Sequence, residues 1–408
     1  MSMSKLDKLI CELCPNGVEY RALGDVCKLI TGATPSKKLS SYWNDGTIPW
    51  MSSGEVSLKR VWSTEAKITQ LAYDKTSTTL VPPHSIVIAL AGQGKTRGKV
   101  AITEIELCTN QSLCSIVCSN ELDYKFLYYY LDGKYEELRS ISNGDGSRGG
   151  LSLKILSPYK IPVPPLDVQR EIVRILDNFT ELTAELTAEL TARKKQYEYY
   201  RDKLLTVDKT TKVVPLREVV KHSCSGGTPT KGVVEYYEKG NIPWIRTQDV
   251  RFNEIYGVDS YITEKAVEKT SAKWIPKNCV IVAISGASAG RCAINRIRAT
   301  TNQHCLNLEI DPQQALYRYV FHCISCKYQE LLGKKQGARG DLNSTLILDT
   351  EIPLPALIEQ ERLVSILDRF DALCNDLTSG LPAEIAARQK QYEFYRDKLL
   401  TFKERISI

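Results

Sequence analysis

The sequence predicts an α+β protein: two globular domains of mixed α/β structure, joined by two long antiparallel helices that form a coiled coil with pseudo-two-fold symmetry. Three observations support this prediction. The chain repeats itself, and its 408 residues exceed the size that one hydrophobic core usually reaches. Each copy of the repeat also ends in a charged stretch of about 40 residues with apolar residues at helical spacing.

The internal repeat consists of short segments that recur in the same order. Both copies contain a Thr-Pro turn followed by Ile-Pro-Trp, then a β-branched run, a Thr-Asn-Gln segment, and a Tyr-rich end close to KQYEYYRDKLLT. The matching pairs are 31–50 with 226–244, 85–92 with 279–286, 109–111 with 301–303, 147–151 with 338–342, 161–166 with 352–357, 170–179 with 361–370, and 195–206 with 390–401.

Each copy divides into a mixed globular part and a helix. β-branched runs after Pro turns predict buried strands, and longer periodic runs predict helices between Gly-, Ser- and Pro-rich loops. We expect an N-terminal segment at 1–17, a first globular domain at 18–165, a long helix at 166–207, a second globular domain at 212–357 and a second long helix at 358–403.

Apolar side chains three or four residues apart form a stripe on each long helix. Such stripes need a partner, so we expect the two helices to pair; two independent domains on linkers are the alternative. The first helix contains two Thr-Ala-Glu-Leu units at 183–190, and Ser-Gly-Leu-Pro at 379–382 should interrupt or kink the second. The residues expected to pack are Ile175, Leu176, Phe179, Leu182, Leu186, Leu190, Leu363, Ile366, Leu367 and Phe370.

Composition is that of an ordinary globular protein, with 43% hydrophobic residues and a net charge of +6. A nucleic-acid-binding protein with so small a charge must gather its cations in loops or on one face. The N-terminus has no apolar export signal and no run is long enough to cross a membrane, so we expect a cytoplasmic protein with reduced thiols. The CxxC pairs at 11–14 and 323–326 have no counterparts in the repeat, so we expect no metal site.

Catalytic motifs are missing. The segment AGQGKT at 91–96 imitates a phosphate-binding loop, but Ala89 stands where its first glycine belongs. None of the four histidines is duplicated, so the two copies cannot share a histidine mechanism. We therefore expect no catalytic residues in this chain.

Basic, Gly-rich loops recur at matching places in both copies and predict contacts with DNA. Backbone amides and Lys or Arg side chains contact phosphates, and Arg and Gln also bind base edges. For any single residue, an ordinary solvated loop position is the alternative. The candidate DNA-binding residues are Lys37, Lys38, Gln93, Lys95, Arg97, Lys99, Arg148, Lys231, Arg246, Gln248, Arg251, Arg291, Lys334, Lys335, Gln336 and Arg339.

Tyrosines and basic residues recur near the ends of both long helices. Exposed Tyr and Arg are common in protein interfaces, but packing between helices explains the pattern equally well. The candidate partner-docking residues are Tyr197, Tyr200, Arg201, Tyr392, Tyr395 and Arg396.

Together these segments make the chain resemble the specificity subunits of type I restriction–modification systems, of the kind with Thr-Ala-Glu-Leu repeats in the central helix. The resemblance covers nearly the whole chain. It is carried by the CPNGVEYRALGDV opening, the duplicated Thr-Pro, Ile-Pro-Trp and Thr-Asn-Gln segments, QREIVRILDNF, and the tract followed by RKKQYEYYRDKLL.

The resemblance implies that each globular domain reads one half of a bipartite, asymmetric site in double-stranded DNA. It implies that the helices set the half-site spacing and dock two modification (methyltransferase) subunits. Restriction subunits would then complete an ATP-dependent endonuclease and adenine-N6 methyltransferase complex. S-adenosylmethionine, ATP and Mg²⁺ would belong to those partners, with no cofactor bound here and no membrane involved. The alternative is a coiled-coil adaptor that does not bind DNA.

Overall fold

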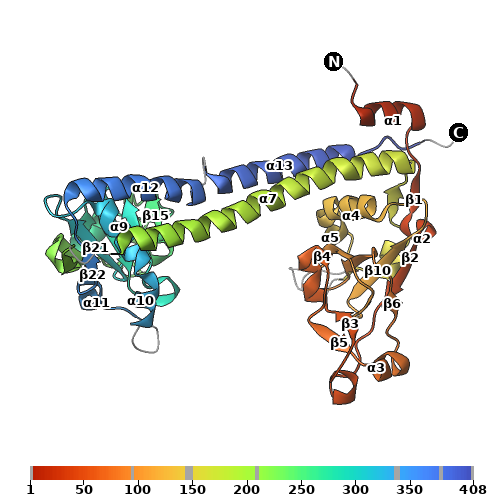
Figure 1. Cartoon of the computed structure of the whole chain (residues 1–408), viewed down its shortest axis with the longest axis horizontal. Coiled ribbons are helices and arrows are strands. Elements are labelled where there is room, and N and C mark those ends of the chain that lie inside the picture. Colours follow the sequence, from red (N-terminus) through yellow and green to blue (C-terminus); the bar gives the residue numbers. More distant parts are fainter. Residues whose placement is uncertain are drawn as a thin grey trace. The chain divides into compact units, whose positions relative to one another are not determined.

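The computed structural model describes residues 3–92, 96–142, 150–206, 211–334, 341–375 and 380–405 (Figure 1). The chain forms two compact units. Unit 1 comprises residues 1–185 and 386–408, and unit 2 comprises residues 186–385. Each unit contains one sheet-and-helix domain and part of both helical regions, which confirms the predicted α+β class.

Unit 1 is built on a five-stranded sheet with the order β2-β10-β7-β8-β4, in which only β4 pairs in parallel. A four-stranded sheet, β5-β3-β9-β6, and a two-stranded sheet, β1-β11, complete it. The strands are β1 (Tyr20–Ala22), β2 (Cys27–Thr31), β3 (Ile48–Met51), β4 (Arg60–Val61), β5 (Ala66–Ile68), β6 (Leu80–Val81), β7 (Ile86–Ala89), β8 (Val100–Thr103), β9 (Leu107–Thr109), β10 (Leu113–Cys118) and β11 (Lys160–Pro162).

Unit 2 repeats this topology, with sheets β13-β21-β18-β19-β15, β16-β14-β20-β17 and β12-β22. The sequence repeat is therefore also a repeat of strand order. The strands are β12 (Val213–Pro215), β13 (Val220–Ser225), β14 (Ile242–Ile245), β15 (Asn253–Ile255), β16 (Tyr261–Ile262), β17 (Trp274–Ile275), β18 (Val280–Ala283), β19 (Cys292–Asn295), β20 (Ala299–Thr301), β21 (Cys305–Ile310) and β22 (Glu351–Pro353).

Each unit also contains short helices. Unit 1 contains α1 (Lys5–Leu13), α2 (Leu23–Val26), α3 (Gln70–Lys75), α4 (Tyr124–Gly133), α5 (Tyr135–Ser140) and α6 (Leu153–Leu156). Unit 2 contains α8 (Glu264–Lys269), α9 (Tyr317–Cys326), α10 (Tyr328–Gly333) and α11 (Ser344–Leu348). Among the described residues, α3, α4, α5 and α6 of unit 1 recur in unit 2 as α8, α9, α10 and α11.

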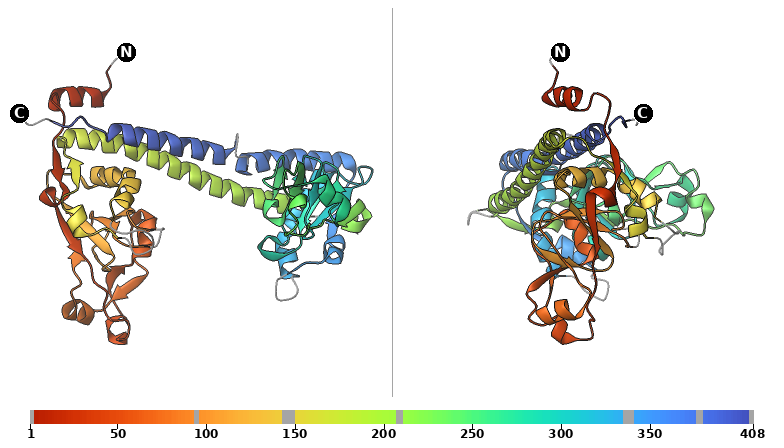
Figure 2. Two further views of the ribbon diagram at one scale, coloured as in Figure 1. Left: turned by 180° about the vertical axis from the view of Figure 1, so that it is seen from behind. Right: turned by 90° about the vertical axis from the view of Figure 1, so that its right-hand side faces the viewer.

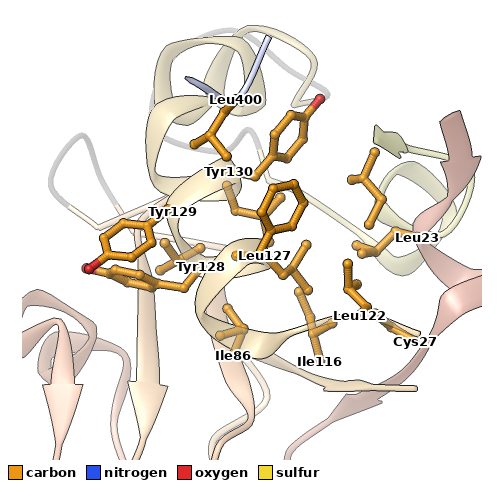
Figure 3. Packing of buried hydrophobic residues seen from close by; sticks show 14 of the residues in the cluster. Leu23, Cys27, Ile86, Ile116, Leu122, Leu127, Tyr128, Tyr129, Tyr130 and Leu400 are labelled. Atoms are coloured by element: carbon orange, nitrogen blue, oxygen red, sulfur yellow. The ribbon is translucent and has the colours of Figure 1, made fainter. Parts of the chain in front are cut away.

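Strand β7 shows why these β-branched runs form central strands. All four of its residues are buried, and alternate side chains point to opposite faces of the sheet. Ile86 and Ile88 pack in the cluster that includes α4, whereas Val87 and Ala89 pack in a second cluster on the other face. Figure 3 shows Leu127 of α4 beside Ile86 and other members of the first cluster. Both faces are thus covered, as a continuous apolar run predicts.

Helix α7 (Leu166–Leu205) is continuous, whereas the second helical region is divided into α12 (Leu357–Asn375) and α13 (Leu381–Leu399). These two helices occupy most of the second helical region expected at 358–403. Gly380 and Pro382 explain the division, because glycine favours a helix end and proline is tolerated only in the first turn. The expected interruption at this sequence is confirmed.

The helices pair within each unit. In unit 1, α13 lies beside α7 (Figure 2), and the rings of Phe179 and Tyr395 stack with centroids 5.4 Å apart. In unit 2, Phe370 of α12 stacks on Tyr200 of α7 at 6.0 Å. Leu176, Leu363 and Leu367 of the predicted stripe are buried, and Leu182 is exposed. The partly buried members are Ile175, Phe179, Leu186, Leu190, Ile366 and Phe370.

Candidate nucleic-acid interface

Three loops leave unit 1 from the same end of its five-stranded sheet, because β2 and β7 end where β8 and β10 begin. Thr31 at the end of β2 pairs with Cys114, and Ala89 at the end of β7 pairs with Leu113. We call this end of the sheet the loop end. The loops that meet there are 32–38, 90–99 and 110–112, of which residues 93–95 lie outside the described part.

Unit 2 has the same loop end. Ser225 at the end of β13 pairs with Leu306, and Ala283 at the end of β18 pairs with Cys305. The segment after β14 also reaches it, since the Phe252 N–H donates to the carbonyl of Cys292 at the start of β19. The loops and segments that meet there are 226–231, 246–251, 284–291 and 302–304.

The duplicated motifs form a hydrogen-bonded framework under these loops. In unit 1 the indole N–H of Trp50 donates to the Ala33 carbonyl at 3.0 Å, and the Ala33 N–H donates to the Thr109 carbonyl at 2.9 Å. The Asn110 N–H closes the set by donating to the Met51 carbonyl at 3.1 Å. The Ile-Pro-Trp and Thr-Asn-Gln segments therefore hold the Thr-Pro loop in place.

The same framework recurs in unit 2. The indole N–H of Trp244 donates to the Gly227 carbonyl at 3.1 Å, and the Gly227 N–H donates to the Thr301 carbonyl at 2.9 Å. The Asn302 N–H donates to the Ile245 carbonyl at 2.9 Å. The repeated residues are thus structural, whereas the loop side chains around them differ between the copies.

A glycine is required where the Thr-Pro loop passes the Thr-Asn-Gln segment. A Cβ at Gly226 would lie 2.0 Å from the Thr301 carbonyl oxygen, and one at Gly32 would lie 1.9 Å from that of Thr109. We expect Gly226→Ala to lower the free energy of unfolding by about 1–3 kcal/mol, the usual cost of overpacking. Urea unfolding followed by circular dichroism would measure this.

Gly232→Ala is the matched control, since a Cβ there meets nothing within 4 Å. It should change the free energy of unfolding by no more than about 0.5 kcal/mol. Equal stabilities of the two variants would show that the loop yields to the extra methyl group and that the close approach is not needed.

The structure places the described candidates for DNA binding in or beside the loop-end segments, apart from Lys334, which follows α10. Lys37, Lys38, Lys231, Gln248, Arg251 and Lys334 are exposed. Arg97, Lys99, Arg246 and Arg291 are partly buried. Gln93, Lys95, Arg148, Lys335, Gln336 and Arg339 lie outside the described residues.

Two exposed aromatic residues that we did not predict lie at the opposite end of the sheets. Trp62 follows β4 and is 67% exposed, and Tyr256 follows β15 and is 71% exposed. Since β4 and β15 run parallel to strands that begin at the loop end, both residues lie away from it. The internal repeat could have identified these residues from the sequence, because Trp62 and Tyr256 occupy equivalent positions in the two copies. Exposed aromatics of this kind are typical of protein interfaces.

An ion pair beside these aromatics is reversed between the copies. Arg60 pairs with Glu104 at 2.8 Å in unit 1, and Glu254 pairs with Arg296 at 2.8 Å in unit 2. Arg60 and Glu254 hold equivalent positions, since each lies opposite an isoleucine of the neighbouring parallel strand. An edge strand that joined the wrong copy would therefore meet a like charge, which disfavours exchange between the units.

The candidate docking residues fall into two groups. Tyr197 and Tyr392 are buried within their own units. The guanidinium groups of Arg201 and Arg396 lie over their rings, at 5.7 Å and 5.6 Å from the centroids. The cause is tertiary packing: α9 covers one tyrosine and α4 the other, and burial raises the pKa of both phenols. These tyrosines are therefore not on the surface.

The remaining aromatics of these helix ends are more accessible. Tyr200 is 39% exposed and Tyr395 is partly buried against Phe179. The most exposed are Tyr199 and Phe394, at 61% and 63%, which belong to the repeated aromatic pattern but were not among the candidate docking residues. They are equivalent in the repeat, so both units present an aromatic ring at the same place.

A carboxylate on each helical region anchors it to its domain. In unit 1, Asp177 of α7 accepts hydrogen bonds from Lys125 at 2.7 Å and from the Tyr129 hydroxyl at 2.6 Å. In unit 2, Asp368 of α12 accepts two hydrogen bonds from Arg318, at 2.6 and 2.7 Å, and lies 2.8 Å from His322 Nε2. The two anchors are equivalent in the repeat. In each unit the carboxylate joins the helical region to the domain, a contact that we call the joint, but the cations that bind it differ.

Charge compensation at Asp368 is reflected in its pKa. Burial alone would raise the pKa of this carboxyl, but hydrogen bonds from His322 and Arg318 outweigh burial and hold the pKa below its ordinary value. His322 is itself fully buried, and its Nδ1 lies 3.3 Å from the Tyr197 hydroxyl. The joint thus connects α7, α9 and α12 through one hydrogen-bonded chain.

The described residues contain no cluster of three or more His, Cys, Asp or Glu side chains that could hold a metal ion. All thirteen cysteines are free thiols. Burial raises the pKa of several of them, to about 11 for Cys108 and about 12 for Cys292, so these thiols stay protonated. Within the part of the chain that the structure describes, no helix is long and apolar enough to cross a membrane.

Comparison with known proteins gives consistent matches. The family model of the type I restriction modification DNA specificity domain matches residues 15–193 and again 208–387. The type I restriction enzyme EcoR124I/EcoR124II specificity subunit of Escherichia coli is 34% identical, with 98% of this chain and 97% of that protein covered.

Two solved structures share the fold. The S subunit of a type I restriction–modification system from M. genitalium has a TM-score of 0.55 and 16% identity, covering 94% of this chain and 96% of its own. A chain from a structure described under complex assembly and conformational transition of the type I R-M system has a TM-score of 0.65 and 17% identity, covering 95% and 98%.

Proposed function

Because the chain belongs to the family of type I restriction–modification specificity subunits, we propose that units 1 and 2 each read one half of a bipartite, asymmetric DNA site. One observation carries this proposal: the two units share a loop-end framework but differ in the side chains it presents. A symmetric protein matches a palindromic site, so two similar units with unlike loops fit two unlike half-sites.

The chemistry of the loop ends suits duplex DNA. Exposed lysines such as Lys37, Lys38 and Lys231 can neutralise phosphates, and Gln248 and Arg251 are of the types that bind base edges. Phosphate contacts position the protein, whereas base contacts give sequence preference.

We also propose that α7 sets the distance between the half-sites. On this helix Asp177, which bonds to the domain of unit 1, and Tyr197, which is buried in unit 2, are 20 residues apart, which corresponds to about 30 Å of helix. That length is close to one turn of DNA, about 34 Å. The Thr-Ala-Glu-Leu units lie between Asp177 and Tyr197, so their number would determine this distance.

The proposed protein partners are two modification (methyltransferase) subunits, with restriction subunits joining them. Specificity subunits are the non-catalytic parts of such systems. Methylation with S-adenosylmethionine, and ATP- and Mg²⁺-dependent cleavage, would belong to the partners. Two copies of one partner need the same surface twice. The chain has two repeated exposed aromatic positions of that kind, one formed by Tyr199 and Phe394 and the other by Trp62 and Tyr256.

DNA binding should depend steeply on salt. For the chain together with its modification partner, the logarithm of the binding constant should fall linearly with the logarithm of salt concentration. Replacing Lys37 and Lys38 by alanine should reduce the slope by about 2. Fluorescence anisotropy with labelled duplexes from 50 to 300 mM salt, roughly the range in which such slopes are resolved, would measure it.

Lys212→Ala is the control, because Lys212 is exposed but pairs with Glu218 away from the loop end. It should leave the slope unchanged. A coiled-coil adaptor would show no sequence-selective binding at any salt concentration, and that result would replace the DNA-reading proposal.

A further inference from the structure

Among the described residues, each unit contains one arginine whose Nε atom is buried without a hydrogen-bond partner. These residues are Arg97 in unit 1 and Arg246 in unit 2. Both side chains as a whole are only partly buried, so the rest of each guanidinium group remains accessible. Leaving a buried donor unpaired is unfavourable, and a small shift of the side chain that brings Nε to a bound acceptor would remove that cost.

The two arginines come from different places in the shared framework. Arg246 corresponds to Ser52 of unit 1, because each residue donates its backbone N–H to a carboxylate three residues later. These distances are 2.8 Å to Asp249 and 2.6 Å to Glu55. Unit 1 therefore has a small hydroxyl side chain where unit 2 has a guanidinium group.

The reverse holds in the loop that follows the central strand. Arg97 precedes Gly98, whose φ is +83°, and its counterpart Ala289 precedes Gly290, whose φ is +88°. The Ala289 side chain is fully buried. In the described part of each unit one arginine is of this kind, but it stands at a different framework position in unit 1 than in unit 2.

A purely structural role explains these side chains poorly. Other arginines with buried groups, such as Arg318 and Arg396, bind a carboxylate. Neither Arg97 nor Arg246 forms an ion pair among the described residues. Arg246 lies over the Trp244 ring, 5.9 Å from its centroid, and this contact fixes the plane of its guanidinium group without using its N–H donors.

We propose that Arg97 and Arg246 are specificity-determining residues, one for each half-site, and that each binds a guanine in the major groove. This inference rests on the DNA-reading function proposed above. Arginine can donate two hydrogen bonds to O6 and N7 of guanine, a geometry that no other base offers. Because the arginines hold non-equivalent framework positions, the two guanines lie at different places within their half-sites.

Methylation by the assembled complex tests the proposal. The chain would be combined with its modification subunits and S-adenosylmethionine, and given duplexes in which both half-sites are randomised. Sequencing would report methylation at each site. Arg246→Ala should reduce the preference for guanine at one position of the unit 2 half-site by about 5- to 150-fold, and leave the other half-site unchanged. Arg97→Ala should do the same in the unit 1 half-site.

Conservative variants separate base reading from charge. Arg246→Lys and Arg97→Lys keep the positive charge but lose the planar donor pair, so they should also relax the guanine preference. These variants also serve if an alanine variant fails to fold, as circular dichroism would show. Lys212→Ala is the control and should leave both half-site preferences intact.

Three results would overturn the inference. A uniform loss of methylation with unchanged base preference would mean that the arginines contact phosphates. Unchanged rate and preference would mean that they do not contact DNA. If the unaltered complex showed no sequence preference at all, the DNA-reading proposal would fall as well, so the two failures are distinguishable.

Discussion

Asp368→Ala is expected to lower the free energy of unfolding by about 1.5–3 kcal/mol, the usual range for losing a hydrogen bond to a charged group. The variant removes two hydrogen bonds to the guanidinium group of Arg318 and one contact to His322. Arg318 keeps its ion pair with Glu254, but His322 is fully buried and loses the carboxylate partner of its Nε2. Urea unfolding followed by circular dichroism at neutral pH would measure the change.

A neighbouring carboxyl provides the control. Burial raises the pKa of Asp371, so its ionised form is less favourable in the folded state than in the unfolded state, and its contribution to stability falls as the pH rises above 3.8. Asp371→Asn removes that charge and should leave the stability at neutral pH unchanged or increased. If Asp368→Ala and Asp371→Asn had equal effects, the joint at Asp368 would not act as a charge pair.

The stability of the protein should depend on pH in a way that reveals the contribution of Asp368. A lowered pKa means that Asp368 stabilises the fold fully above 3.8, its ordinary value, and that this contribution disappears as the pH falls through the folded-state pKa. Asp368→Ala should therefore lose less stability than the unaltered protein in this acidic range. A parallel loss in both proteins would assign acid unfolding to other carboxyl groups.

The sequence predicts the long helices well, because their spacing and their interruption depend on residues close together in the chain. The stripe containing Leu176 and Leu367 follows helical spacing, and both residues are buried. The division between α12 and α13 follows from Gly380 and Pro382, which act on their own backbone. These features need no knowledge of distant contacts.

The surface could not be predicted in the same way, because exposure depends on residues far away in the sequence. Tyr197 and Tyr199 are two residues apart on α7, yet only Tyr197 is covered, by His322 and its neighbours. Trp62 is a large apolar side chain, but it follows β4, which is an edge strand, and it is left exposed. The unpaired Nε of Arg246 likewise becomes visible only once every nearby acceptor has been placed.

Inserting one more Thr-Ala-Glu-Leu unit after Leu190 is expected to lengthen the preferred gap between half-sites by one or two base pairs. Four added residues extend an α-helix by about 6 Å and rotate its end by about 40°. DNA rises about 3.4 Å per base pair and turns once in about 10 base pairs, so the extension corresponds to nearly two base pairs and the rotation to about one. Methylation of sites with graded gaps, by the complex with its modification subunits, would measure the preferred length.

A two-residue insertion at the same place is the matched control. It rotates the following residues by about 200°, which turns the apolar stripe of α7 away from its partner helix, so it should destabilise the protein instead of selecting a new gap. The four-residue insertion nearly preserves the stripe. It also makes the span from Asp177 to Tyr197 equal to the 24 residues between Asp368 and Tyr392, where the division between α12 and α13 already interrupts the helix. An unchanged preferred gap in a stable four-residue variant would mean that α7 does not measure the distance between half-sites.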